Sequence, residues 1–198
     1  MAFQNIVFPE LKLVHGMSKV KSDSSTSVFG NGYREYRVKR GNVNPIRWSF
    51  PGRALVKSDA QTLIDFYNTV DGISDSFKFK DPDDHKWTLF RLENLSSSLW
   101  TVKSNTGSYI FHLDGSINVY LNDVFHSSVT SVTISNGVPV FNIAGTTSSD
   151  KIEVTGRFYY AARFDSSISY DLAALTNNNE TAAILLGDVS LKEVPEYA

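Results

Sequence analysis

Large hydrophobic residues alternate with polar ones along much of the chain. In the clearest case Ile46, Trp48 and Phe50 are separated by Arg47 and Ser49. Successive side chains of a strand point to opposite faces, so this spacing predicts a strand with one buried face. The stretches with this pattern are 46–50, 77–80, 117–121 and 152–154, the last running into the aromatic-rich residues 158–164. We therefore expect a mainly β protein.

Three dipeptides that favour tight turns lie between such stretches. They are Asn31-Gly32, Asp114-Gly115 and Asn136-Gly137. Asn-Gly and Asp-Gly accept the positive φ angles of a two-residue hairpin loop, so each predicts a β-hairpin. Pro139 cannot donate a hydrogen bond to a neighbouring strand, which favours an edge strand or a bulge at that point.

One segment has helical spacing instead. Its apolar residues form a stripe on one face of a helix of about residues 59–71: Leu63, Ile64, Phe66, Tyr67 and Val70. Ser58 followed by Gln61 has the spacing of a capping box at the start of this helix. A weaker helical pattern covers residues 171–175.

These elements predict a β-sandwich or split β-barrel with one packed α-helix and a small β insert. The composition changes near residue 96, and residues 109–155 consist of short strands and turns with few charges. We interpret 101–155 as a possible inserted small β domain in a body formed by 1–100 and 156–198. The alternative is two long hairpins in the same sheet.

Composition excludes several classes of protein. With 41% hydrophobic and 20% charged residues among 198, the chain can form a core, and global disorder is not expected. A net charge of −2 gives no sign of a nucleic-acid-binding protein, and the absence of cysteine excludes disulfides and thiolate catalysis. The N-terminus lacks signal-peptide features and the longest apolar run is Ala182–Leu186, so we expect a soluble protein made in the cytoplasm.

The sequence offers little catalytic chemistry. The four histidines are scattered: His15, His85, His112 and His126. No nucleophile elbow and no glycine-rich phosphate loop is present, so we expect no enzyme, no cofactor and no metal. The densest acidic cluster is Asp81-Pro82-Asp83-Asp84, which could hold a hard cation. Its spacing is not that of an EF-hand, and the pattern favours a turn.

Basic and aromatic residues are concentrated in one region. Six basic residues lie within twenty positions, interleaved with aromatic ones: Arg34, Arg37, Lys39, Arg40, Arg47 and Arg53, with Tyr33, Tyr36 and Trp48. This pattern fits a nucleic-acid patch, a subunit interface rich in arginine and aromatics, or the solvated face of a strand.

Three ordered stretches carry a resemblance. They are 36–42 leading into Arg47-Trp48-Ser49-Phe50-Pro51-Gly52-Arg53; the predicted helix followed by Phe77-Lys78-Phe79-Lys80-Asp81-Pro82-Asp83-Asp84; and 156–165 followed by 189–194. In this order they resemble the distal tail proteins of long-tailed phages and gene transfer agents. The order of the set carries the resemblance more than any single motif.

The resemblance implies a structural virion protein that forms a homo-hexameric ring between the tail tube and the tail tip or baseplate hub. Such a ring surrounds the tape-measure protein and later the passing DNA, and it is made in the host bacterial cytoplasm. We expect these residues to be core or interface anchors: Tyr36, Arg47, Trp48, Phe50, Arg53, Phe77, Phe79, Asp81, Asp84, Arg163 and Phe164. The acidic loop and the arginines are candidates for ion pairs between subunits.

Two other functions fit the sequence. In the first, residues 109–155 bind a carbohydrate or a host surface, with Tyr109, Tyr120 and Phe125 as faces on which sugars stack; the plainer interpretation is a solvated β surface. The second is a tail-associated wall hydrolase, which the absence of nucleophile motifs disfavours.

Overall fold

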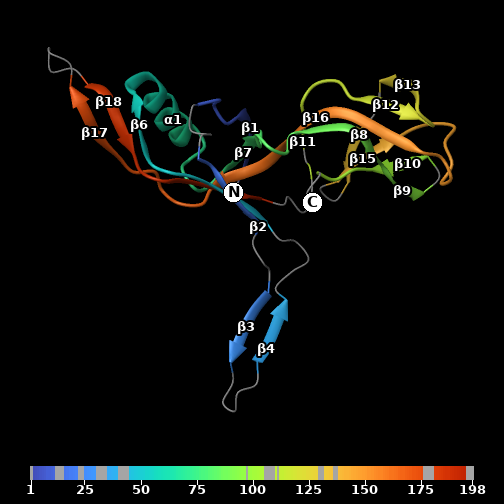
Figure 1. The fold of residues 1–198 in the computed structure, drawn as a ribbon, viewed down its shortest axis with the longest axis horizontal. Helices are drawn as coiled ribbons and strands as arrows, with labels where there is room; N and C mark the ends of the chain where they lie inside the picture. The colour runs from blue at the N-terminus through green and yellow to red at the C-terminus, as the bar shows by residue number, and fades with distance from the viewer. Residues whose placement is uncertain are drawn as a thin grey trace. The chain divides into compact units, whose positions relative to one another are not determined.

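The structure is a computed structural model that describes residues 2–11, 16–21, 25–29, 35–39, 45–96, 98–104, 110, 112–128, 132–135, 138–175 and 181–194. Over these residues the protein is mainly β, built from several sheets and one α-helix (Figure 1). The predicted fold class, a β-sandwich with one helix, is confirmed.

The chain divides into two compact units. The first comprises Met1–Phe8, Asp75–Ala162 and Val194–Ala198, and the second comprises Pro9–Ser74 and Arg163–Glu193. The first unit contains the whole of the expected insert, 101–155, together with residues on both sides of it. That residues 101–155 form a domain by themselves stays a prediction.

The first unit is organised around β16 (Ile152–Phe164), of which residues up to Ala162 belong to it. Four strands pair with β16 antiparallel: β7 (Ser76–Phe79), β8 (Lys86–Arg91), β11 (His112–Leu113) and β12 (Asn118–Leu121). Two further strands belong to this sheet, β1 (Phe3–Val7) parallel to β7 and β13 (Val124–Ser128) antiparallel to β12.

A second sheet of the same unit has the order β14-β15-β10-β9. Its strands are β14 (Val132–Ser135), β15 (Val138–Asn142), β10 (Leu99–Thr101) and β9 (Glu93–Ser96). Both sheets bury large aromatic residues: Trp87 and Phe158 from the first, Trp100 and Phe141 from the second. Aromatic burial of this size dominates the stabilisation of a small core.

The second unit contains a run of three antiparallel strands with β5 (Ile46–Phe50) in its middle. Its neighbours are β19 (Val189–Glu193) and β2 (Ser18–Lys21). The predicted alternation of β5 holds, because Ile46, Trp48 and Phe50 are all buried.

The unit also has a three-stranded sheet, a helix and a hairpin. The sheet consists of β17 (Tyr170–Leu175), β18 (Thr181–Leu186) and β6 (Arg53–Val56), and α1 (Lys57–Thr69) lies against β6 and β18 (Figure 1). The hairpin is β3 (Ser25–Phe29) with β4 (Glu35–Lys39).

The helix is present, but its predicted start is wrong. It begins at Lys57, directly after β6, and its N-cap residue Val56 makes no side-chain capping hydrogen bond. Gln61 does not form a capping box, since its amide donates to Oδ1 of Asp65 at 2.8 Å. The helix therefore begins where β6 ends, without a capping side chain.

Two other local predictions are wrong. Residues 171–175 lie in strand β17, where they pair with β18. Pro139 lies on β15, which is between β14 and β10 and so is an inner strand. The carbonyl of Pro139 accepts a hydrogen bond from the Thr101 hydroxyl at 3.0 Å.

The three hairpin predictions have two different outcomes. Asp114-Gly115 is not a hairpin turn, because β11 and β12 pair one after the other with β16 and not with each other. The turn that joins β12 to β13 is Asn122-Asp123, both with positive φ, 50° and 68°. Asn31-Gly32 and Asn136-Gly137 lie outside the described residues, although the strands on either side of each pair antiparallel.

Candidate functional site

The predicted aromatic anchors of the second unit are core residues. Trp48 and Phe50 are almost completely buried on β5. Beside them Oε2 of Glu193, a buried carboxylate on β19, accepts a hydrogen bond from the N–H of Ile46 at 2.8 Å. This bond fixes the start of β5 against the end of β19.

Phe164 connects the end of β16 to the helix. It is fully buried, and its ring contacts Tyr67 edge-on with centroids 4.9 Å apart and Phe66 at 6.3 Å. Both aromatic residues belong to α1, so Phe164 anchors the helix within the second unit. Such edge-to-face pairs contribute about 0.5–1.5 kcal/mol each beyond the area they bury.

Two of the predicted arginines, Arg47 and Arg163, have partners within this unit. Nε of Arg47 lies 3.4 Å from Oδ2 of Asp165, in an ion pair whose arginine side chain is 51% exposed. Nη1 of Arg163 donates to the carbonyl of Ile73 at 3.0 Å, and Arg53 is half-buried. Arg47 is thus the most exposed of the three, and the ion pairs expected between subunits stay a prediction.

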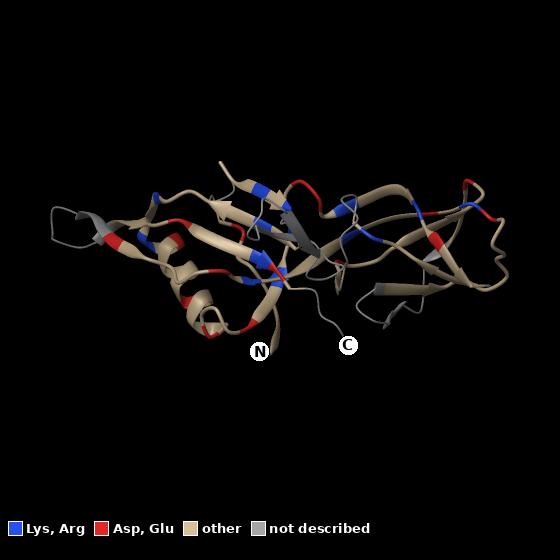
Figure 2. Ribbon diagram, turned by 90° about the horizontal axis from the view of Figure 1, so that it is seen from below, with Lys and Arg blue, Asp and Glu red and all other residues tan. Residues whose placement is uncertain are grey.

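Part of the basic region lies outside the described residues. Arg34 and Arg40 lie outside the described residues, and of β4, which carries Tyr36, Arg37 and Lys39, only the backbone is described. Elsewhere Lys and Arg are interspersed with Asp and Glu along the described strands (Figure 2).

The acidic loop of the first unit is a turn. Oδ1 of Asp81 accepts the N–H of Asp83 at 3.0 Å, and the carbonyl of Asp81 accepts the N–H of Asp84 at 3.3 Å. Asp81 and Asp84 are buried and Asp83 is exposed, so an ion pair with another subunit would fall to Asp83. Within the described ranges no group of three or more histidine or acidic side chains could hold a metal ion.

Buried groups hold this turn in place. The Tyr160 hydroxyl donates to Oδ2 of Asp84 at 2.7 Å, and Nδ1 of His85 lies 2.7 Å from the carbonyl oxygen of Asp81. The strand before the turn contributes Phe77 and Phe79, whose buried rings contact Phe8 with centroids 5.8 and 5.7 Å away. The sequence spacing predicted the turn, but it did not predict that two of its three carboxylates, those of Asp81 and Asp84, are buried.

The sheet β17-β18-β6 has apolar residues on both faces of its inner strand. Leu55, Ile184 and Leu186 are buried on the face toward α1. On the opposite face Ala54 pairs with Leu185 and Val56 pairs with Ala183. Val56 is 57% exposed and Leu185 is 46% exposed. We call this surface of Ala54, Val56, Ala183 and Leu185 the open face.

No protein-family model and no curated protein matches this sequence. Among the residues that the structure describes, no helix has the length and apolarity needed to cross a membrane.

The site residues predicted from sequence fall into both units. Phe77, Phe79, Asp81 and Asp84 belong to the first, and Arg47, Trp48, Phe50, Arg53, Arg163 and Phe164 to the second. Sequence reasoning missed the open face, although the uninterrupted apolar run 182–186 was a signal for it, since such runs are typical of strands covered on both faces.

Proposed function

We propose that this chain is a distal tail protein, a structural subunit whose copies form a hexameric ring between a tail tube and the tail tip or baseplate hub. The ordered sequence stretches that resemble this family support the assignment. The observation that carries it in the structure is the open face, which leaves apolar residues of β6 and β18 exposed.

The open face is suited to association with another copy. A strand in contact with water on one face normally alternates apolar and polar residues, but the outward positions of β6 and β18 are alanine, valine and leucine. The polar neighbour on this face is Asp171 of β17, which lies opposite Leu185. Contiguous exposed apolar surface of this kind commonly marks an interaction site. In a closed ring each subunit covers such a surface on its neighbour with a different surface of its own.

The remaining partners follow from the proposed position in the tail. The ring would contact the tail tube protein on one side and hub or tip proteins on the other, and it would surround the tape-measure protein and the passing DNA. The protein would act in the virion, at the tail tip, without a cofactor. These assignments rest on the resemblance alone.

Native mass spectrometry of the purified chain, with negative-stain images, tests the proposal. We expect six times the subunit mass of 22.1 kDa and ring-shaped particles. Leu185→Lys should give monomers, because desolvating a charged ammonium group in the contact is costly even though Asp171 of β17 lies opposite this position. Leu95→Lys on β9 is the matched control, since Leu95 is 55% exposed, and should leave the hexamer intact.

One result would contradict the proposed ring, and another would contradict its contact surface. One is a wild-type chain that stays monomeric at high concentration even with tail tube protein added. The other is a hexamer that survives Leu185→Lys, which would exclude the open face as the ring contact. The alternative function, carbohydrate binding, is supported by a different surface of the first unit.

A further inference from the structure

Four side chains on neighbouring strands of the first unit lie at one register. Tyr120 on β12 is opposite Phe125 on β13 and, on its other side, opposite Glu153 on β16. Glu153 in turn is opposite Arg91 on β8. Residues directly opposite each other in a sheet share a face, so the row Phe125–Tyr120–Glu153–Arg91 crosses four strands on one face.

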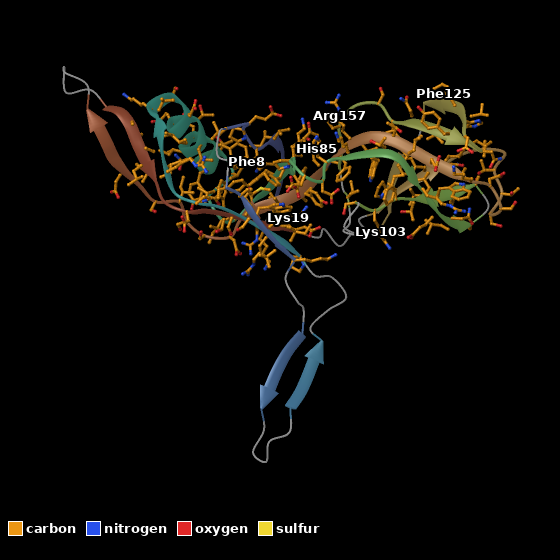
Figure 3. All side chains as sticks on the ribbon, in the orientation of Figure 1. Phe8, Lys19, His85, Lys103, Phe125 and Arg157 are labelled. Carbon is orange, nitrogen blue, oxygen red and sulfur yellow. The ribbon has the colours of Figure 1, made fainter. Side chains whose placement is uncertain are left out.

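This row is on the outer face of the sheet. The flanking residues on β12 and β16, Val119, Ile152 and Val154, point the other way and are fully buried. Phe125 is 57% exposed, Arg91 is exposed, and Tyr120 and Glu153 are half-buried. The Tyr120 and Phe125 rings are 5.9 Å apart in an edge-to-face arrangement, and Figure 3 places Phe125 on β13.

Hydrogen-bonding groups surround the aromatic pair. Two positions along the strands, and so on the same face, Asn118 lies opposite Thr155, whose hydroxyl accepts the N–H of Leu89 at 3.1 Å. At the other end Nζ of Lys151 lies 2.6 Å from Oδ1 of Asp123 and 3.1 Å from Oε1 of Glu153. The surface therefore combines an exposed ring with carboxylate, guanidinium, amide and hydroxyl groups.

We propose that this row is a binding site for a neutral oligosaccharide. One face of a pyranose ring presents C–H groups, which pack on an aromatic face, while its hydroxyls donate to carboxylates and accept from guanidinium and amide groups. Phe125 and Tyr120 supply the aromatic surface. Glu153 and Arg91 lie next to them, where hydroxyls at the edge of a stacked sugar would be.

The charges on this face favour a neutral ligand. Arg91 and Lys151 are balanced by Asp123 and Glu153, and the two acids are held against Lys151. A polyanion such as nucleic acid requires a net positive surface, which this balance does not give. The proposal is independent of the ring, because it concerns a different unit from the open face.

Phe125→Ala tests the site on the full-length protein. The chain is screened on an array of neutral bacterial oligosaccharides and polysaccharides, and the best binder is titrated by NMR. We expect wild type to bind in the millimolar range or tighter, and Phe125→Ala and Glu153→Gln each to weaken binding at least about tenfold. Leu95→Ala, which shortens an equally exposed apolar side chain on β9, should bind like wild type.

Three outcomes would overturn the proposal. The first is a folded wild-type protein that binds no array glycan at millimolar concentration. The second is binding that Phe125→Ala leaves unchanged. The third is loss of the oligomer in Phe125→Ala, which would make the row a contact between copies. Native mass spectrometry separates the two proposals, since Leu185→Lys should abolish the ring and keep glycan binding.

Discussion

The Tyr160 hydroxyl donates a 2.7 Å hydrogen bond to Oδ2 of Asp84, and both side chains are buried. Tyr160 lies on β16 opposite Phe79 of β7, the strand that leads into the acidic turn. The bond therefore joins the turn to the longest strand of the first unit. Two of the three carboxylates in this acidic cluster are therefore buried, and Asp83 remains exposed.

Tyr160→Phe removes this hydrogen bond and leaves the aromatic ring in place. We expect the free energy of unfolding to fall by about 1–3 kcal/mol, the usual cost of removing a buried hydrogen bond to a charged group. Urea denaturation measures it. Tyr170→Phe, at a 53% exposed position, is the control and should change stability by less than about 0.5 kcal/mol. Equal effects of the two substitutions would contradict this role for the bond.

Features with a strong local period were predictable. Strand β5 matches the predicted 46–50 because its alternation is uninterrupted, and the helix exists because its apolar stripe buries Ala60 and Leu63. Local signals failed where long-range pairing decides the structure. Asp114-Gly115 has hairpin chemistry, yet β11 and β12 each find a partner in β16, more than thirty positions along the chain.

The candidate sites show the same limit. Phe125 and Tyr120 could be proposed from sequence as exposed aromatics, but their alignment with Glu153 and Arg91 could not. That row depends on the register between β8, β12 and β16, which is set by burial of the inner face across the whole sheet. Burial of Asp81 and Asp84 could not be predicted from the sequence either, because acidic residues are seldom buried unless they have partners. Here the partner of Asp84, Tyr160, is 76 positions away along the chain.

Trp48→Ala should strongly destabilise the second unit. Trp48 is 0% exposed, so the substitution leaves a large cavity on β5. We expect a loss of about 3–5 kcal/mol, measured by thermal or chemical denaturation. Phe125→Ala, which removes a ring that is 57% exposed, should cost far less. A Trp48→Ala protein that melts and assembles like wild type would show that Trp48 is not an anchor.

Arg47→Gln should have a small effect that depends on salt. The Arg47–Asp165 pair is 3.4 Å apart, but its arginine is half exposed, so the expected loss is at most about 1 kcal/mol. Screening should reduce the difference toward zero at about 1 M NaCl. Denaturation at low and high salt measures it. A larger loss that persists in high salt would mean that Arg47 contributes by packing, as long side chains often do.

His112 should make the first unit sensitive to acid. Its ring stacks on Phe3 with centroids 4.3 Å apart, and its buried Nε2 has no hydrogen-bond partner among the described residues. Burial, with the nearby positive charge of Lys78 as a second cause, lowers the pKa of His112 from 6.5 to about 4. The folded protein therefore holds this ring neutral at a pH where the unfolded chain would protonate it.

The sign of the pH dependence follows from this difference. Between pH 6.5 and about 4 the unfolded state binds the extra proton, so stability is fully present above pH 6.5 and falls as the pH drops toward 4. Because the ring is only partly buried, we expect a loss of about 1–2 kcal/mol, less than the full shift would give.

His112→Gln should remove this loss, and His126→Gln, at an exposed position, should keep it. Urea denaturation at several pH values measures the free energy of unfolding of both variants. Carboxylates that titrate in the same pH range affect the two variants equally, so the difference between them isolates the contribution of His112. If both variants lost stability equally between pH 6.5 and 4, the acid sensitivity would not come from His112.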